Sequence, residues 1–142
     1  MKLVADTNVL VSGILWDGPP ARLLDAALSG GARLFVSPAL RQELSEVLNR
    51  PKFAERLRVS NTSADTLVAR LVGACHEIAP ARILPPEGLR DPDDSHVLAC
   101  AVAAGADAVV SGDRDLLALG TFGGIPIIDV GAALGMLPPA QP

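Results

Sequence analysis

Short runs of apolar residues alternate along the chain with longer segments whose apolar positions repeat at helical spacing. The short runs are rich in branched side chains and have the length of buried strands. Because helical segments separate them, consecutive strands are expected to run parallel, with helices on both faces of the sheet. The pattern predicts an α/β domain of three layers with a mostly parallel sheet of about five strands. These strands cover residues 2–6, 32–36, 75–79, 108–111 and 125–129.

Capping residues mark where several of the helices begin and end. Ser37 and Pro38 are typical of an N-cap and a first helical turn, and Gly105 is placed to end a helix. One domain is predicted over residues 1–137, and the proline-rich residues 138–142 predict a frayed tail. Helices are predicted over residues 9–15, 19–29, 38–48, 64–73, 94–104 and 116–119.

Length and composition favour a single domain that folds without disulfide bonds or structural metal ions. The chain has 142 residues, and 49% of them are apolar. Cys75 and Cys100 lie far apart, which indicates small core residues rather than a disulfide or a zinc site. Asp6 and Asn8 interrupt the first apolar run, and no later run has the length of a membrane span. We therefore expect neither a signal peptide nor contact with a membrane, and we expect a cytoplasmic protein.

The charge of the chain is unevenly distributed. Its net charge of −4 argues against binding nucleic acid by bulk attraction, although five basic residues gather in one part of the sequence. They are candidates for contacts with RNA phosphates, and a solvated charged surface is the alternative. The five residues are Arg41, Arg50, Lys52, Arg56 and Arg58.

Three carboxylates stand within four residues directly before the helix predicted over 94–104. Helix capping, a solvated acidic loop and a bound cation are three explanations, and capping alone requires only one acid. Asp94 occupies the first position of the buried stripe, whereas Asp93 points about 100° away from it. The other members of that stripe are Val97, Leu98, Ala101 and Val102.

Other acids occupy places where ligand sites form in parallel sheets. Asp6 and Asp113 each follow a predicted strand, where capping a helix or forming a turn is the alternative. Asp115 either shares the site of Asp113 or caps the next short helix. Glu43 lies on the flank of the apolar stripe of its helix, where a solvated side chain is the alternative.

Convergence of Asp6, Glu43, Asp94 and Asp113 would make a cation necessary. Carboxylates about 4–5 Å apart repel by several kcal/mol per pair at an effective dielectric constant near 20. Such a site either takes up protons or binds a cation. Oxygen ligands without histidine or thiolate suit Mg²⁺ or Mn²⁺, and these ions activate water for phosphodiester hydrolysis.

These motifs together resemble those of the PIN-domain ribonucleases. The resemblance extends from Leu3 to about Ile128, and the chain is most similar to the VapC-type toxins of bacterial toxin–antitoxin pairs and their close relatives. All four motifs in this order and spacing are fairly specific, although each alone is weak. They are VADTN at 4–8, SPALRQEL at 37–44, DPDD at 91–94 and SGDRDLL at 111–117.

The resemblance implies endonucleolytic cleavage of RNA by water that one or two Mg²⁺ or Mn²⁺ ions activate. It implies that Asp6, Glu43, Asp94 and Asp113 form an acidic quartet that holds the metal and performs the catalysis. It also implies homodimers and an antitoxin protein that blocks the site. The accessory residues are Asn8, which orients the quartet, Ser111, where threonine is common, and the acids Asp91 and Asp115.

Other functions are compatible with the same fold. One alternative is a catalytically inactive module that binds RNA or protein, and another is an RNA-processing nuclease that is not a toxin. A metal-dependent phosphatase is disfavoured, because Asn8 replaces the second acid of an Asp-x-Asp nucleophile pair. His96 is expected to be a solvated residue on a polar helix face. Trp16 is expected either to anchor a partner or to fill the core.

Overall fold

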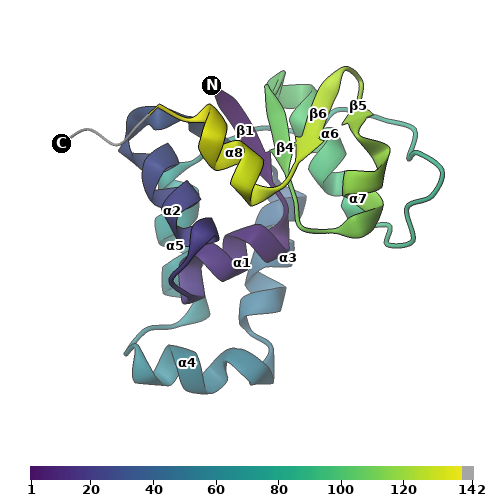
Figure 1. Cartoon of the computed structure of the whole chain (residues 1–142). Helices are drawn as coiled ribbons and strands as arrows, with labels where there is room; N and C mark the ends of the chain where they lie inside the picture. Colours follow the sequence, from purple (N-terminus) through teal and green to yellow (C-terminus); the bar gives the residue numbers. More distant parts are fainter. Residues whose placement is uncertain (139–142) are drawn as a thin grey trace.

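A computed structural model describes residues 1–138 and contains a six-stranded sheet in the order β3-β2-β1-β4-β6-β5. All neighbouring strands are parallel except β5 and β6, so the central strand β1 has a parallel neighbour on each side. Figure 1 shows β1 and β4 side by side in the middle of the sheet. The strands are β1 (Lys2–Ala5), β2 (Arg33–Val36), β3 (His76–Glu77), β4 (Ala108–Val110), β5 (Thr121–Phe122) and β6 (Ile125–Ile128).

Helices cover both faces of this sheet. The side chains of a strand alternate between the two faces, so neighbouring residues of β1 enter different cores. Leu3 packs in the larger core, while Val4 packs in the smaller core beneath α6. The helices are α1 (Thr7–Leu15), α2 (Pro19–Ala26), α3 (Pro38–Leu48), α4 (Ala54–Val59), α5 (Ala64–Ala74), α6 (Asp94–Ala104), α7 (Arg114–Leu119) and α8 (Val130–Met136), with a π-helical turn at Ala27–Gly31 and a 3₁₀ turn at Pro51–Phe53.

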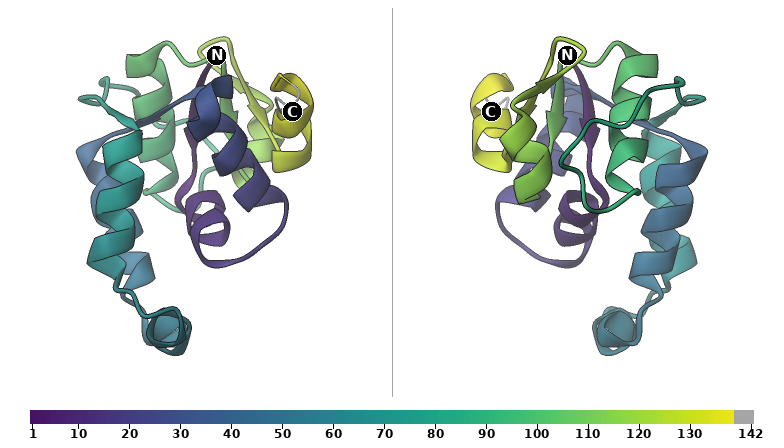
Figure 2. Two further views of the ribbon diagram at one scale, coloured as in Figure 1. Left: turned by 90° about the vertical axis from the view of Figure 1, so that its left-hand side faces the viewer. Right: turned by 90° about the vertical axis from the view of Figure 1, so that its right-hand side faces the viewer.

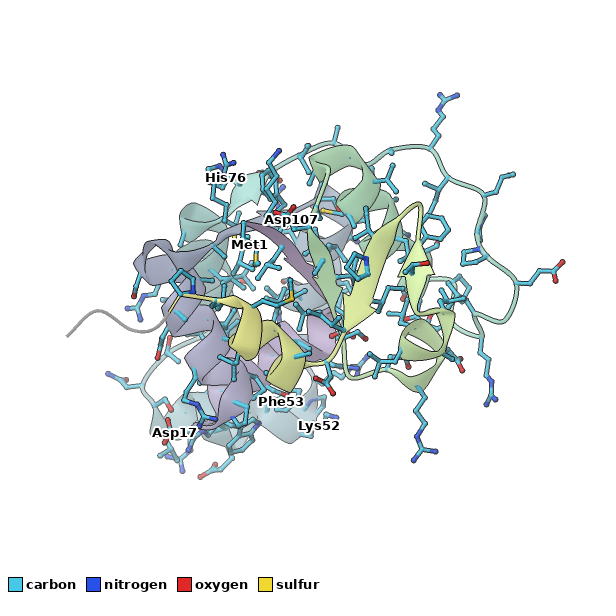
Figure 3. The ribbon with its side chains drawn as sticks, turned by 45° about the horizontal axis from the view of Figure 1, so that its top comes forward. Met1, Asp17, Lys52, Phe53, His76 and Asp107 are labelled. Atoms are coloured by element: carbon cyan, nitrogen blue, oxygen red, sulfur yellow. The ribbon has the colours of Figure 1, made fainter. Side chains whose placement is uncertain are left out.

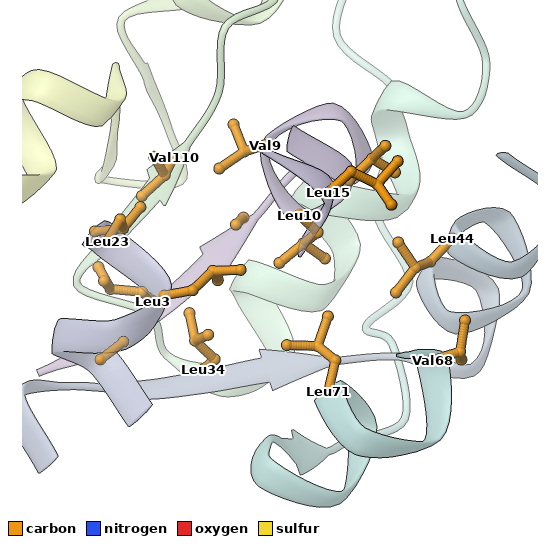
Figure 4. Close-up of a cluster of buried hydrophobic side chains, with 14 of the residues drawn as sticks. Leu3, Val9, Leu10, Leu15, Leu23, Leu34, Leu44, Val68, Leu71 and Val110 are labelled. Carbon is orange, nitrogen blue, oxygen red and sulfur yellow. The ribbon is translucent and has the colours of Figure 1, made fainter. Parts of the chain in front are cut away.

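The larger core joins the sheet to a helical arm. Leu3 and Leu34 from the sheet pack with Leu10 of α1, as Figure 4 shows. Leu44 of α3 and Leu71 of α5 continue the same cluster into the arm. Helices α3 and α5 form the two sides of the arm, and α4 lies at its tip, beyond the carboxyl end of β1 (Figures 1 and 2). The arm therefore projects on the side of the sheet where the candidate acids follow their strands.

The fold class predicted from the sequence is confirmed, and all five predicted strands are present. The prediction of about five strands is one short, because the two-residue strand β5 was not anticipated. Helices α4 and α8 were not anticipated either. The domain boundary at residue 137 stays a prediction, and the predicted tail lies outside the described residues except for Pro138. Both cysteines are free, and no helix within residues 1–138 has the length and hydropathy needed to cross a membrane.

Replacing Gly13 with Ala is expected to destabilise the fold by about 1–3 kcal/mol, although Ala favours a helix. A Cβ at this position would lie 2.5 Å from Leu24 Cδ1 and 2.9 Å from the Pro20 carbonyl oxygen, because α1 and α2 cross closely there. Chemical denaturation measures the change. Gly73→Ala in α5 is the matched control, since an added Cβ there meets nothing within 4 Å. Equal stability of the two variants would contradict the close crossing.

Candidate active site

Asp6 is buried at the carboxyl end of β1 and is held by two donors. Its Oδ1 accepts a hydrogen bond of 2.9 Å from Val9 N and thereby caps α1, as the capping alternative predicted. The Ser111 hydroxyl donates to Oδ2. Burial raises the pKa of Asp6, and the hydrogen bonds from Ser111 and Val9 oppose the rise. The carboxylate is therefore fixed in orientation although it is largely removed from water.

Ser111 connects Asp6 to Asp113. Ala5 of β1 is in register with Val110 of β4, so the residues that follow these strands meet at the same edge of the sheet. Ser111 Oγ accepts a hydrogen bond of 2.9 Å from Asp113 N. Asp113 Oδ2 in turn accepts one of 3.0 Å from Leu116 N and caps α7. One polar chain thus runs from β1 across β4 to α7.

Asp94 is the first residue of α6 and lies partly buried near the other two aspartates. Burial, and to a smaller extent the charges of Asp113, Asp91, Asp6 and Asp115, together raise its pKa from 3.8 to about 7. Because these charges act on Asp94, the three predicted aspartates lie within electrostatic reach of one another at this edge of the sheet. The sequence led us to expect that four acids, including Glu43, converge in one site, and this arrangement stays a prediction.

The stripe predicted on α6 is correct except at its last position. Val97, Leu98 and Ala101 are buried, whereas Val102 is 37% exposed and was wrongly predicted to be buried. The helix contacts β1, β2 and β4, and its buried face also includes Ala99, Cys100 and Ala104, so this face is wider than the predicted stripe and is centred away from Val102. Asp94 precedes the buried positions by three, four and seven residues, which places it over the edge of the sheet.

The acids before α6 are not helix caps. Asp93 occupies the N-cap position, but its side chain makes no capping hydrogen bond and is 56% exposed. Asp91 instead stabilises the turn, because its Oδ1 accepts a hydrogen bond of 2.9 Å from Asp93 N and its carbonyl oxygen accepts one of 3.1 Å from Asp94 N. Asp93 is therefore a solvated loop charge, as expected, and capping by side chains does not explain the crowding.

Glu43 lies on the inner flank of α3 and is half-buried rather than solvated. Its Oε2 is buried and has no hydrogen-bond partner within residues 1–138. Burial raises the pKa of Glu43, as do the charges of Asp93 and Asp91, while the Thr7 hydroxyl and His96 lower it. Thr7 lies near enough to act in this way, although its hydroxyl does not meet the geometry of a hydrogen bond. Glu43 thus faces the turn before α6 more than it faces Asp6.

The carboxylates lie in one region of the molecule, but their side chains are not arranged as a metal-binding site. Within residues 1–138, no three His, Cys, Asp or Glu side chains are arranged so that they could hold a metal ion. The chemistry of the donors nevertheless suits a hard cation, since the group is made of carboxylate and hydroxyl oxygens. The unpaired Glu43 Oε2 and the raised pKa of Asp94 are both signs of negative charge that a cation would stabilise.

Two of the accessory residues lie in the first turns of the helices that follow Asp6 and Asp113. Asn8 is exposed on the first turn of α1. Asp115 is partly buried on α7, and its Oδ2 lies 3.7 Å from Arg90 Nε. Arg90 comes from the loop before α6 and was not singled out from the sequence, because only the folded chain brings that loop to α7. It places a positive charge at the mouth of the site.

Three of the five basic residues predicted to contact RNA already have protein partners. Arg41 forms an ion pair of 3.3 Å with Glu77, and Arg58 pairs with Glu55. Arg56 Nε donates a 2.9 Å hydrogen bond to the Leu15 carbonyl oxygen, and its guanidinium stacks 4.6 Å from the Trp16 ring. The indole is 48% exposed, so Trp16 is not core filler.

Arg50 and Lys52 are exposed on the arm. Lys52 Nζ lies 5.0 Å from the centre of the Phe53 ring. Figure 3 shows Lys52 and Phe53 on the opposite side of the ribbon from Met1 and Asp107, which mark the amino-terminal edge of the sheet. The RNA-binding role of the basic residues stays a prediction, and these two are its best remaining candidates.

Replacing Ser111 with Ala is expected to destabilise the fold by about 1–3 kcal/mol. The change leaves the buried Asp6 Oδ2 and the Asp113 amide without their shared hydroxyl, and it raises the pKa of Asp6 further. Urea denaturation at pH 7 measures the loss. Ser60→Ala removes an exposed hydroxyl and is the control. A stability equal to that of the control would show that the hydroxyl does not support the acids.

A comparison with known protein families identifies the family to which these residues belong. The family model described as PIN domain matches residues 2–115, which run from β1 into α7 and include the four candidate acids. No curated protein matches the chain. PIN domains are generally nucleases, and those nucleases typically use divalent metal ions. Because the match covers most of the sequence, the chain belongs to the PIN-domain family.

Proposed function

We propose that the protein is a metal-dependent endoribonuclease that hydrolyses RNA phosphodiester bonds and acts as the toxin of a type II toxin–antitoxin pair. The observation that supports the enzymatic part is that Asp6, Asp94 and Asp113 lie at one edge of the sheet, where burial first, and then the charges of the other acids, raise the pKa of Asp94 to about 7. A stable fold gains nothing from gathering repelling carboxylates, whereas a cation-dependent active site requires them. An inactive binding module would have no need to retain this charge.

The metal, Mg²⁺ or Mn²⁺ in one or two copies, would be held by Asp6, Asp94, Asp113 and Glu43. When bound, it supplies a hydroxide-like water at neutral pH and stabilises the charge that develops on the phosphate. The carboxylates must rotate toward one another to enclose it, since no three of them do so within the described residues. Glu43 has the freedom to do this, because its Oε2 has no partner to release.

The environments of Asp6, Asp94 and Arg90 give these residues different roles in the proposed reaction. Asp6 keeps one orientation because the Val9 amide and the Ser111 hydroxyl hold its two oxygens. Asp94 gives up its proton near neutral pH, so the full negative charge of the group is present only above about pH 7. Arg90 beside Asp115 offers a cation to the phosphate backbone of RNA.

The toxin role, the antitoxin partner and the homodimer rest on the resemblance of the motifs. Two exposed apolar side chains on or beside the arm are suited to a protein contact. Trp16 is 48% exposed and Val59 is 66% exposed. Of the two, Trp16 is the better candidate for an anchor, because tryptophan is enriched among the residues that carry binding energy at protein interfaces.

Cleavage of a circular RNA tests the enzymatic proposal, because a circle has no ends for an exonuclease. We expect linear products with Mg²⁺ or Mn²⁺, none with EDTA, and none from Asp6→Asn with either ion. If the wild-type protein binds Mn²⁺ and RNA but leaves circular and linear RNA intact, the inactive binding module is the correct function. Induced expression tests the toxin role: growth should stop with the wild-type chain and continue with Asp6→Asn.

A further inference from the structure

We propose that a cavity beside the acidic group is a slot for one nucleobase of single-stranded RNA, next to the bond that is cut. This inference rests on the proposed function, and it makes the slot a feature that determines which sites in RNA are cut. The cavity has a volume of about 460 Å³, which lies within the range of small-ligand pockets. It is distinct from the acids themselves, because none of the four candidate carboxylates lines it.

Three segments far apart in the sequence form the walls of this slot. The first turn of α3 contributes Ala39, and α6 contributes His96 and Ala99. The loop after β3 contributes residues 80–83 and Pro85. A hydrogen bond of 3.1 Å from Ala81 N to the Ala99 carbonyl oxygen fixes the loop against α6. The slot is therefore built into the packing of the domain and does not depend on a free chain end.

The slot shares a wall with the acidic group. Ala39 and His96 line both this cavity and a smaller one of about 220 Å³, whose other lining residues include Glu43 and Asp93. Ser95, which also lines the slot, directly follows Asp94. The slot therefore borders the side of the acidic group that Glu43 and the first turn of α6 form, and the proposal places the phosphate of the bound nucleotide on that side.

The lining chemistry favours a flat heteroaromatic ring over other occupants. Ile83 and the prolines provide apolar walls, and the His96 imidazole provides a surface for stacking. His96 Nδ1 is buried without a hydrogen-bond partner within the described residues, because Asp93 Oδ1 lies 3.8 Å away. This nitrogen faces Asp93, which does not line the slot, so the contact expected from His96 in the slot is stacking and not a hydrogen bond from Nδ1. Arg82 at the exposed rim supplies a cation for the adjoining phosphate.

Nucleotide titrations followed by amide NMR test the slot without any catalytic step. The four nucleoside 5′-monophosphates are added to the wild-type protein in EDTA, with ribose 5-phosphate as the probe that lacks a base. We expect at least one nucleotide to shift the amides of Ala39, Ala81 and Ala99, and ribose 5-phosphate to leave them in place. Equal shifts from ribose 5-phosphate would show a phosphate site and overturn the proposal.

Variants with larger side chains on the walls of the slot provide a second test. Ala39→Leu and Ala81→Leu add bulk on two of its walls, and each is expected to weaken nucleotide binding at least 10-fold. Ala69→Leu on the exposed face of α5 is the control and should bind as the wild type does. Thermal unfolding of each variant separates loss of the slot from loss of the fold. Unchanged binding in a folded Ala39→Leu variant would overturn the proposal.

Cleavage assays separate this inference from the proposed function. Metal-dependent cleavage without any nucleotide-induced shifts would leave the nuclease proposal intact and reject the slot. Shifts that depend on the base, without cleavage, would support the slot and reject the nuclease. If a peptide produces these shifts and nucleotides do not, the cavity binds protein instead and the proposal is wrong.

Discussion

Asp94→Asn is expected to lower metal-dependent RNA cleavage by about 10³-fold or more while making the fold more stable at neutral pH. The substitution keeps the shape of the side chain but removes the charge that Asp113, Asp91, Asp6 and Asp115 surround. Initial rates on a defined RNA at saturating Mg²⁺ or Mn²⁺ measure the first effect. Asp93→Asn is the matched control, since Asp93 is the neighbouring acid but is 56% exposed and makes no capping hydrogen bond.

The sign of the stability change follows from the raised pKa. Asp94 titrates at about 7 in the folded chain and at about 3.8 when unfolded, so the folded state holds the extra proton between these values. Stability therefore falls as the pH rises from about 4 to 7. Asn carries no charge, so the variant should gain about 1 kcal/mol at pH 8, after screening by solvent, and nothing at pH 4. A variant that is less stable at pH 8 and still cleaves RNA would contradict both roles of Asp94.

The strand–helix alternation and the place of Asp94 could be predicted because both follow local periodicity. Asp94 precedes Val97, Leu98 and Ala101 at helical spacing, and these residues are buried as expected. Asp6 and Asp113 were found in the same way, since the carboxyl ends of parallel strands share one edge. Local patterns thus placed these three candidate acids at one edge of the sheet even though they come from three separate segments.

Features that depend on tertiary contacts or on very short elements could not be predicted. The strand β5 has two residues and pairs only with β6, so it has no periodicity of its own. Arg56 was grouped with RNA contacts because the sequence does not reveal that it binds the Leu15 carbonyl oxygen 41 positions away. The burial of Glu43 Oε2 likewise depends on elements that pack against α3, among them α1 and α6, and not on the flank position alone.

Saturating Mn²⁺ is expected to raise the midpoint of thermal unfolding at pH 8 by roughly 8–12 °C. A ligand at about 100 times its dissociation constant adds about 2.7 kcal/mol to the stability of the folded state. For a domain of this size, each kcal/mol corresponds to a shift of roughly 3–5 °C. The ion is expected to relieve the repulsion that the grouped carboxylates impose on one another, so the metal-free protein should be at its least stable where these acids are fully charged.

The same titration at pH 5 distinguishes the acidic group from metal binding elsewhere. Because the pKa of Asp94 is about 7, this carboxyl is protonated at pH 5, and the ion must displace the proton before it binds. Most of the rise in the unfolding midpoint that Mn²⁺ produces at pH 8 should therefore be absent at pH 5. In Asp94→Asn, Mn²⁺ should raise the midpoint of thermal unfolding little at either pH. In the wild type, EDTA should reverse the rise in the midpoint. An equal shift at both pH values, or one retained in Asp94→Asn, would place the ion outside the group formed by Asp6, Asp94 and Asp113.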